Sequence, residues 1–143
     1  LHRVDRRQRQ MCIRDRGIDP ARWVWHGQVP SLWQTLKTLD AHAYIGSAPM
    51  SGGRGAVEAH GCGYPVLPFN GFHEDSLLAD YSSYADLDLA WQNIPELLAR
   101  LGALKPRVEE ASQRARQFYE QCFSQHVFVK KLEELDQGES TGA

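Results

Sequence analysis

Glycine and arginine residues between positions 52 and 55 have the types and the spacing of an anion-binding site. Gly52, Gly53 and Gly55 carry no Cβ atom, so their backbone can adopt positive φ angles and approach a ligand closely. Arg54 lies in the same turn, and its guanidinium group can donate two parallel hydrogen bonds to phosphate oxygens. The helix expected to follow adds free N–H groups and the positive end of its dipole. These features predict that the turn binds a phosphate group.

Glu58 lies four residues after Arg54, and this spacing puts both side chains on the same face of a helix. A carboxylate just beyond a phosphate site can accept hydrogen bonds from sugar hydroxyls, which is the functional interpretation. In the alternative, the two side chains form an ordinary ion pair within the helix, which contributes only about 0.2–0.5 kcal/mol. The glycines then merely form a tight turn, and both interpretations stay open at this point.

Two short apolar runs flank this turn and predict the elements that position it. Residues 44–48 and 65–69 have the length and composition of buried strands, and between them come a loop at 49–55 and a helix of small residues. Two strands joined through a helix are expected to be parallel. The segment therefore predicts a unit of strand, loop, helix and strand.

The sequence GGRGAVEAHGCGYPVLPF at positions 52–69 resembles the donor-binding segment of glycosyltransferases with the GT-B fold. In that family a glycine-rich loop, a helix with a glutamate, the pattern EA-small-x-G-x-PV and a strand follow in this order. The resemblance extends upstream through VWHGQVPSLWQTLKTLDAHAYIGSAP at 24–49 and downstream to QFYEQCFSQHVFVKKL at 117–132. We take it to cover residues 17–136.

The resemblance implies a fold, an activity and a set of site residues. The fold is α/β, a partial Rossmann-like doubly wound parallel sheet that forms the C-terminal half of a GT-B donor domain and is closed by C-terminal helices. The activity is transfer of a sugar from a nucleotide diphosphate sugar to an unknown acceptor, with no cofactor or metal beyond the donor. Loop amides hold the diphosphate and the glutamate binds the ribose. The implied donor-binding residues are Ser51, Gly52, Gly53, Arg54, Gly55 and Glu58.

The resemblance leaves the catalytic residues and the stereochemistry open. Many retaining members carry a second acidic residue eight positions before the glutamate, where this chain has Met50. The acceptor site and the catalytic base would lie in an N-terminal domain of the same chain, which is therefore an expected partner. His73, Glu74 and Asp75 follow the second apolar run, and we expect them to be exposed loop residues rather than groups that face the donor sugar.

Three other functional interpretations follow from the same residues. A nucleotide-sugar epimerase of the same architecture would share the site and form its product without an acceptor. A dinucleotide-dependent oxidoreductase requires the pattern G-x-G-x-x-G and an acidic residue roughly 20 positions further on. The sequence SGGRGAVEAHG lacks that pattern. The remaining possibility is that the fragment is inactive on its own.

Composition excludes several classes of protein. Among the 143 residues, 42% are hydrophobic and 24% are charged, and no apolar run approaches the ~20 residues that a membrane span requires. The three cysteines, Cys12, Cys62 and Cys122, are odd in number and lack metal-ligand spacing, which predicts reduced thiols and a cytoplasmic location. The six histidines are scattered along the chain, which disfavours a metal site.

Residues 1–16 differ from the rest of the chain in charge, since they contain six Arg and two Asp. The sequence RQRQMCIRDR at 7–16 resembles the read-through translation of a sequencing-library adapter, so we expect a non-native or disordered arm that contributes nothing to the fold. Without this arm the chain has ten basic and sixteen acidic residues, a net charge of −6, which disfavours nucleic-acid binding. The predicted domains are the arm, a donor-binding domain at 17–136 and a disordered tail at 137–143.

Capping residues and apolar spacing predict the remaining elements. Ser31 and Asn93 are expected N-caps of two helices, which run to about residue 39 and to Gly102, respectively. Longer amphipathic helices are predicted at 105–121 and 127–135, the second one capped by Ser124. Short strands are predicted at 23–25 and 85–90.

Overall fold

A computed structural model of the protein describes residues 17, 19–24, 26–47, 53–70 and 85–139. The chain divides into two compact units, Leu1–Pro30 and Ser31–Ala143, and we describe each by itself.

The first unit contains a short 3₁₀ helix, η1 (Pro20–Arg22), among its described residues. Asp19 stabilises its start, because the carboxylate accepts a hydrogen bond from the backbone N–H two residues later at 2.9 Å. The strand predicted at 23–25 is not formed at its described residues, and the side chain of Val24 is 72% exposed. A strand requires a neighbouring strand, and the sheet that the described residues form lies in the second unit. The predicted arm at 1–16 lies outside the described residues.

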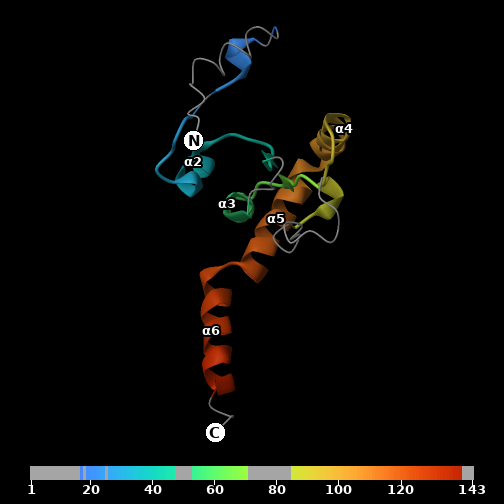
Figure 1. The fold of residues 1–143 in the computed structure, drawn as a ribbon. Helices are drawn as coiled ribbons and strands as arrows, with labels where there is room; N and C mark the ends of the chain where they lie inside the picture. The colour runs from blue at the N-terminus through green and yellow to red at the C-terminus, as the bar shows by residue number, and fades with distance from the viewer. Residues whose placement is uncertain (1–16, 18, 25, 48–52, 71–84, 140–143) are drawn as a thin grey trace. The chain divides into compact units, whose positions relative to one another are not determined.

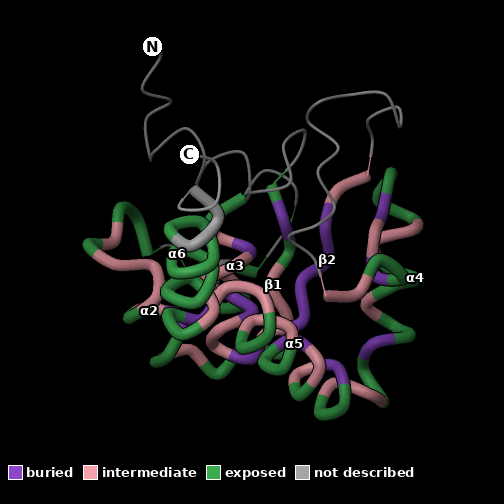
Figure 2. The backbone as a smooth tube through the Cα atoms, turned by 90° about the horizontal axis from the view of Figure 1, so that it is seen from below, coloured by how far each residue is buried: buried purple, intermediate pink, exposed green. Residues whose placement is uncertain are grey.

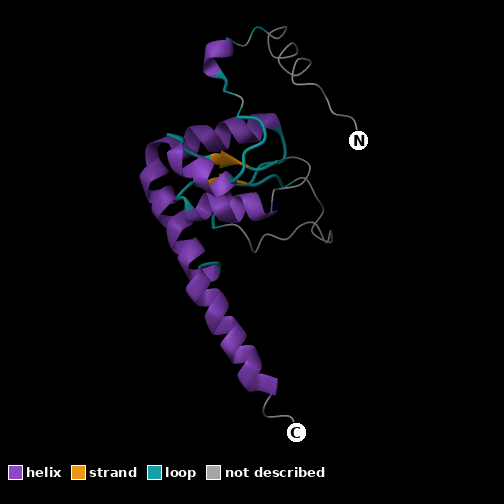
Figure 3. Cartoon of the chain, turned by 90° about the vertical axis from the view of Figure 1, so that its left-hand side faces the viewer, coloured by secondary structure: helices purple, strands orange, loops and turns teal. Residues whose placement is uncertain are grey.

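The second unit is mostly helical, and Figure 3 shows its two short strands among the helices. Figure 1 labels the longer helices along the chain. The elements in order are α2 (Leu32–Thr38), β1 (Tyr44–Ile45), α3 (Gly53–Gly61), β2 (Val66–Leu67), η2 (Leu87–Leu89), α4 (Ile94–Leu104), η3 (Lys105–Arg107), α5 (Val108–Cys122) and α6 (Gln125–Glu139). The prediction of a doubly wound parallel sheet is therefore wrong, because the described residues form a sheet of only two strands.

The local order of strand, helix and strand is confirmed. Of the loop predicted at 49–55, residues 53–55 belong to α3 and the others lie outside the described residues. Strands β1 and β2 are parallel, and α3 lies between them in sequence. The paired residues are Tyr44 with Val66 and Ile45 with Leu67. One isolated parallel bridge, between Phe69 and Trp91, extends the pairing just beyond β2. The sheet therefore has the predicted direction but not the predicted width.

Two prolines and an acidic segment border β2 and limit its regular pairing, although both proline carbonyls accept backbone hydrogen bonds, from Tyr44 and from Trp91. Strand β2 is flanked by Pro65 and Pro68, which have no N–H group to donate to a ladder. The segment predicted as a strand at 85–90 instead forms η2, in which the Ala90 N–H donates to the Leu87 carbonyl at 3.0 Å. Its two aspartates disfavour the extended conformation that a strand requires.

The predicted N-caps of α2 and α4 are both confirmed. Ser31 Oγ accepts a hydrogen bond from Gln34 N at 3.3 Å, and Asn93 Oδ1 accepts one from Glu96 N at 2.9 Å. The prediction that Gly102 ends α4 is wrong, since the helix continues for two more residues. No atom would lie within 4 Å of a Cβ at this glycine, so the position is open.

The C-terminal helices differ from their predicted bounds. Helix α5 begins at residue 108 rather than 105, because η3 precedes it. Helix α6 begins two residues earlier than predicted and ends at residue 139, within the stretch predicted as a disordered tail. The hydroxyl of Ser124, the predicted cap of α6, donates to the Glu120 carbonyl in α5 at 2.8 Å. None of the helices in the described part of the chain is long and apolar enough to span a bilayer.

Strand β2 separates two groups of buried side chains, because neighbouring residues of a strand point to opposite faces. Figure 2 shows β2 and parts of α3 and α5 among the buried stretches. On one side Val66 packs with Leu36, Ala56 and Ala59. On the other side Leu67 packs with Leu89, Trp91, Leu104 and Ala111. The indole of Trp91 is also satisfied, since its Nε1 donates to the Leu67 carbonyl at 3.0 Å.

Candidate functional site

The N-terminus of α3 is the centre of the candidate site. Gly53, its first residue, has a φ of 39°, in the left-handed region that favours glycine, which confirms the predicted positive φ at this position. No atom would lie within 4 Å of a Cβ at Gly53. Glycine is therefore favoured here by the backbone conformation and not by a lack of space for a side chain. Ser51 and Gly52, the other predicted residues of the turn, lie outside the described residues.

Gly55 lies close to a side chain of β1. A Cβ atom at this position would lie 2.8 Å from the hydroxyl oxygen of Tyr44 and 3.5 Å from Leu32 Cδ2. Gly55 therefore makes room for the Tyr44 hydroxyl from β1, and its expected approach to a ligand stays a prediction. The contact fixes the first turn of α3 against the strand that precedes it.

Arg54 and Glu58 form the ion pair that their spacing predicts. Arg54 Nε lies 2.6 Å from Glu58 Oε1, and the two side chains are 92% and 15% exposed, respectively. The pair contributes little to stability, about 0.3–0.5 kcal/mol for this spacing on a helix surface. Its geometry matters more, because the pair places an exposed cation and a largely buried carboxylate on one face of α3. The contact engages Nε alone, so the guanidinium retains its two terminal amino groups as donors.

Cys62 lies one turn after Glu58 in a partly buried position behind the site. Burial raises the pKa of the Cys62 thiol; Lys37 and Arg116 oppose this rise, whereas the Glu58 carboxylate adds to it. The thiol faces the carbonyl of Trp33, with Sγ and O separated by 3.8 Å. Cys62 is therefore a protonated, inward-facing thiol at neutral pH. Both it and Cys122 are free cysteines, as expected, and Cys12 lies outside the described residues.

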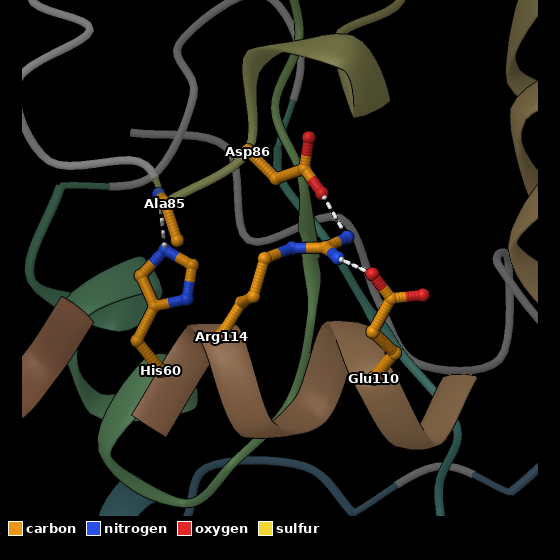
Figure 4. Close-up of polar contacts among 5 residues, drawn as sticks. All are labelled: His60, Ala85, Asp86, Glu110 and Arg114. Carbon is orange, nitrogen blue, oxygen red and sulfur yellow. Dashed lines mark hydrogen bonds and ion pairs between the residues drawn. The ribbon is translucent and has the colours of Figure 1, made fainter. Parts of the chain in front are cut away.

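A buried histidine, which the sequence analysis did not identify, supports the C-terminal end of α3. His60 is 1% exposed, and its Nε2 accepts a hydrogen bond from the Ala85 N–H at 3.4 Å (Figure 4). Its ring meets Phe118 of α5 edge to face, with a centroid distance of 5.4 Å. An Nε2 that accepts a hydrogen bond belongs to a neutral imidazole. His60 thus connects α3 to the segment that leads into η2.

Arg114 of α5 holds the same segment through a second contact. Its Nη2 lies 2.8 Å from Asp86 Oδ2, and its Nη1 lies 2.5 Å from Glu110 Oε1 (Figure 4). The hydrogen bond with Asp86 is the main cause of a raised pKa at Arg114, so the guanidinium is charged throughout the working range of pH. The four-residue spacing of Glu110 and Arg114 is visible in the sequence, but nothing there signals the contact with Asp86.

The loops that follow β1 and β2 begin at the same edge of the sheet. Because β1 and β2 are parallel, their carboxyl ends point the same way, and ligands of α/β sheets bind at such an edge. The first loop leads into α3, and the second contains His73, Glu74 and Asp75, which lie outside the described residues. The described residues contain no group of three or more His, Cys, Asp and Glu side chains that could hold a metal ion.

Comparison with known proteins adds no relative. No family model, curated protein or solved structure matches the chain. Its function is therefore inferred from the residues of the site and from the motif at 52–69.

Proposed function

We propose that this chain is part of a glycosyltransferase that uses a nucleotide diphosphate sugar as donor. The observation that carries the proposal is the pairing of Arg54 with Glu58, Nε to Oε1 at 2.6 Å, in the first turns of a helix that follows a parallel strand. A helix N-terminus and an arginine favour a diphosphate, and a neighbouring carboxylate favours the hydroxyls of a ribose. The resemblance of residues 52–69 to a donor-binding segment supports the same class of ligand.

The proposed roles follow from the positions of the atoms. The first N–H groups of α3 have no partner within the helix and donate to the diphosphate. Arg54 keeps its Nε on Glu58 and turns its terminal amino groups to the phosphate oxygens. The second carboxylate oxygen of Glu58 accepts a hydrogen bond from a ribose hydroxyl. The same donors stabilise the negative charge that develops on the diphosphate as it leaves the sugar. We further propose a cytoplasmic location, because the free thiols Cys62 and Cys122 fit a reducing compartment.

A ligand panel tests the proposed donor. The melting temperature of the intact chain is measured with nucleoside diphosphates and with the matching monophosphates. A diphosphate present at 100 times its Kd stabilises the protein by about 2.7 kcal/mol, which a melting curve detects, and monophosphates should bind more weakly. Arg54→Ala should abolish the preference for the diphosphate. Arg100→Ala, at an exposed position of α4, is the control and should leave it unchanged.

Two results would contradict the proposal. One is a protein that melts cooperatively but shows no shift with any diphosphate. The other is a diphosphate that binds equally well to the chain and to Arg54→Ala. If instead a nucleotide sugar is converted to an isomer without an acceptor, the site belongs to an epimerase and not to a transferase.

A further inference from the structure

Residues 85–88 contact α3 through a polar group of that helix. Their own side chains are half-buried or exposed, and the side chain that follows them, Leu89, is the first that is buried. The contact with α3 is a hydrogen bond, in which the Ala85 N–H donates to His60 Nε2 at 3.4 Å (Figure 4). The position of this segment therefore depends on a ring nitrogen that can take up a proton.

A proton on His60 Nε2 is incompatible with this hydrogen bond. The nitrogen would become a donor, and it would face the Ala85 N–H, which is also a donor. The ring is 1% exposed, so an imidazolium at this position would lose nearly all of its hydration. Phe118, which meets the ring edge to face, brings no ionised group to it. Charging His60 is therefore more favourable once the segment moves away and water reaches the ring.

The charged groups that the described residues bring near the ring do not favour an imidazolium. Arg114 of α5 lies one turn before Phe118 and is a cation. The two carboxylates beside it, Asp86 and Glu110, are already paired with it, at 2.8 Å from Nη2 and 2.5 Å from Nη1, respectively. On α3 itself, the residues one turn before His60 are apolar. The dipole of α3 favours a cation at its C-terminal end, but this effect is smaller than the cost of burying a charge.

We propose that His60 is an acid-sensitive switch, whose protonation breaks the hydrogen bond with Ala85 and detaches residues 85–88 from α3. Leu89 stays in the core and Arg114 holds the segment on α5, so the movement is confined to the side that faces α3. Histidine ordinarily titrates near pH 6.5, and burial shifts its protonation to lower pH. The contact is therefore complete above about pH 6.5 and is lost as the pH falls. The switch does not depend on the proposed donor site.

Nuclear magnetic resonance of the intact, isotopically labelled chain tests the switch. At about pH 7, a coupling between the Ala85 nitrogen and His60 Nε2 should report the N–H···N hydrogen bond. As the pH is lowered to about 5, the His60 ring should become protonated and the coupling should vanish. The protection factor of the Ala85 amide against hydrogen exchange should fall by about tenfold or more. The ring of His126, which is exposed on α6, should take up its proton at a higher pH than the ring of His60.

Two variants separate the switch from a general effect of acid. In His60→Gln the amide oxygen can accept from the Ala85 N–H but cannot be charged, so the Ala85 protection should be the same at both pH values. His126→Gln is the matched control and should keep the native acid response. An acid response that persists in His60→Gln overturns the proposal.

The native chain alone provides two further outcomes that would overturn it, even if His60→Gln does not fold. One is an Ala85 amide that stays protected after the His60 ring has taken up its proton. The other is a His60 ring that remains neutral down to about pH 4.5, roughly two units below the ordinary value for histidine.

Discussion

Gly61 at the end of α3 lies directly against the indole of Trp33 in α2, so closely that a Cβ atom at this position would overlap the six-membered ring. Tyr119 of α5 closes the same space, with its ring centroid 5.8 Å from that of Trp33. The glycine therefore lets three helices meet behind the candidate site. Lys37 covers the outer side of the indole, with its Nζ 4.7 Å from the ring centroid.

Replacing Gly61 with alanine should therefore destabilise the protein by about 1–3 kcal/mol, the usual cost of overpacking a filled site. Gly102→Ala provides the matched control. No atom would meet a Cβ at Gly102, and alanine is the better helix former, so this change should be neutral or should stabilise the protein by up to about 1 kcal/mol. Urea denaturation of both variants measures the difference. Equal stability of the two variants would show that the helices separate easily at Gly61.

We expect substitutions of the two acidic partners of Arg114 to have unequal effects on the stability of the protein. Asp86 is 15% exposed and joins segments 28 residues apart, whereas Glu110 is 67% exposed and lies one turn away on the same helix. Asp86→Asn should cost about 1.5–3 kcal/mol, because it removes a charged hydrogen bond from a largely buried site. Glu110→Gln should cost at most about 0.5 kcal/mol. A double-mutant cycle with Arg114→Met isolates each contact, and similar coupling energies for the two acids would refute this ranking.

The stability of the protein should decline at alkaline pH because of Cys62. Burial raises the pKa of this thiol above its ordinary value of 9.0. The unfolded chain then releases the thiol proton at a lower pH than the folded chain does. The contribution to stability is complete below about pH 9 and is lost as pH rises through the folded pKa. Unfolding free energies measured between about pH 8 and 11 check this.

Cys62→Ala is the control for the alkaline decline, since it removes the titrating group and should flatten the pH dependence in that range. Alkylation gives an independent measurement. At pH 8 the Cys62 thiol should react more slowly with iodoacetamide in the folded protein than in urea, because little thiolate is present when the chain is folded. Equal rates in the two conditions would mean that burial does not protect the thiol.

Local features of the fold could be predicted from the sequence because their causes are local. Ser31 and Asn93 cap helices through side-chain oxygens that reach an N–H three residues away. Arg54 and Glu58 meet because a helix brings residues four apart together. The parallel pairing of β1 with β2 follows from two apolar runs separated by one helix.

The features that escaped prediction depend on distant residues. Gly55 is required by Tyr44, and Gly61 by Trp33, and neither contact leaves a pattern in the sequence. The strand expected at 85–90 instead forms η2, because its two aspartates disfavour the extended conformation of a strand. Sequence spacing therefore predicted the ion pair between Arg54 and Glu58 but not the contacts that support α3.

A substitution at Glu58 distinguishes a ligand-binding role of this residue from a structural one. Glu58→Gln keeps the size of a side chain that is only 15% exposed. It removes the negative charge of the group that is proposed to accept hydrogen bonds from the ribose hydroxyls. A hydrogen bond to a charged group contributes about 1.5–3 kcal/mol, so the affinity for a nucleoside diphosphate should fall at least tenfold. The melting temperature should change little, because the ion pair with Arg54 is weak. Glu109→Gln, at an exposed position of α5, is the control and should alter neither quantity. If Glu58→Gln melts several degrees lower and still binds the nucleotide as before, Glu58 is a structural residue and the ribose assignment is wrong.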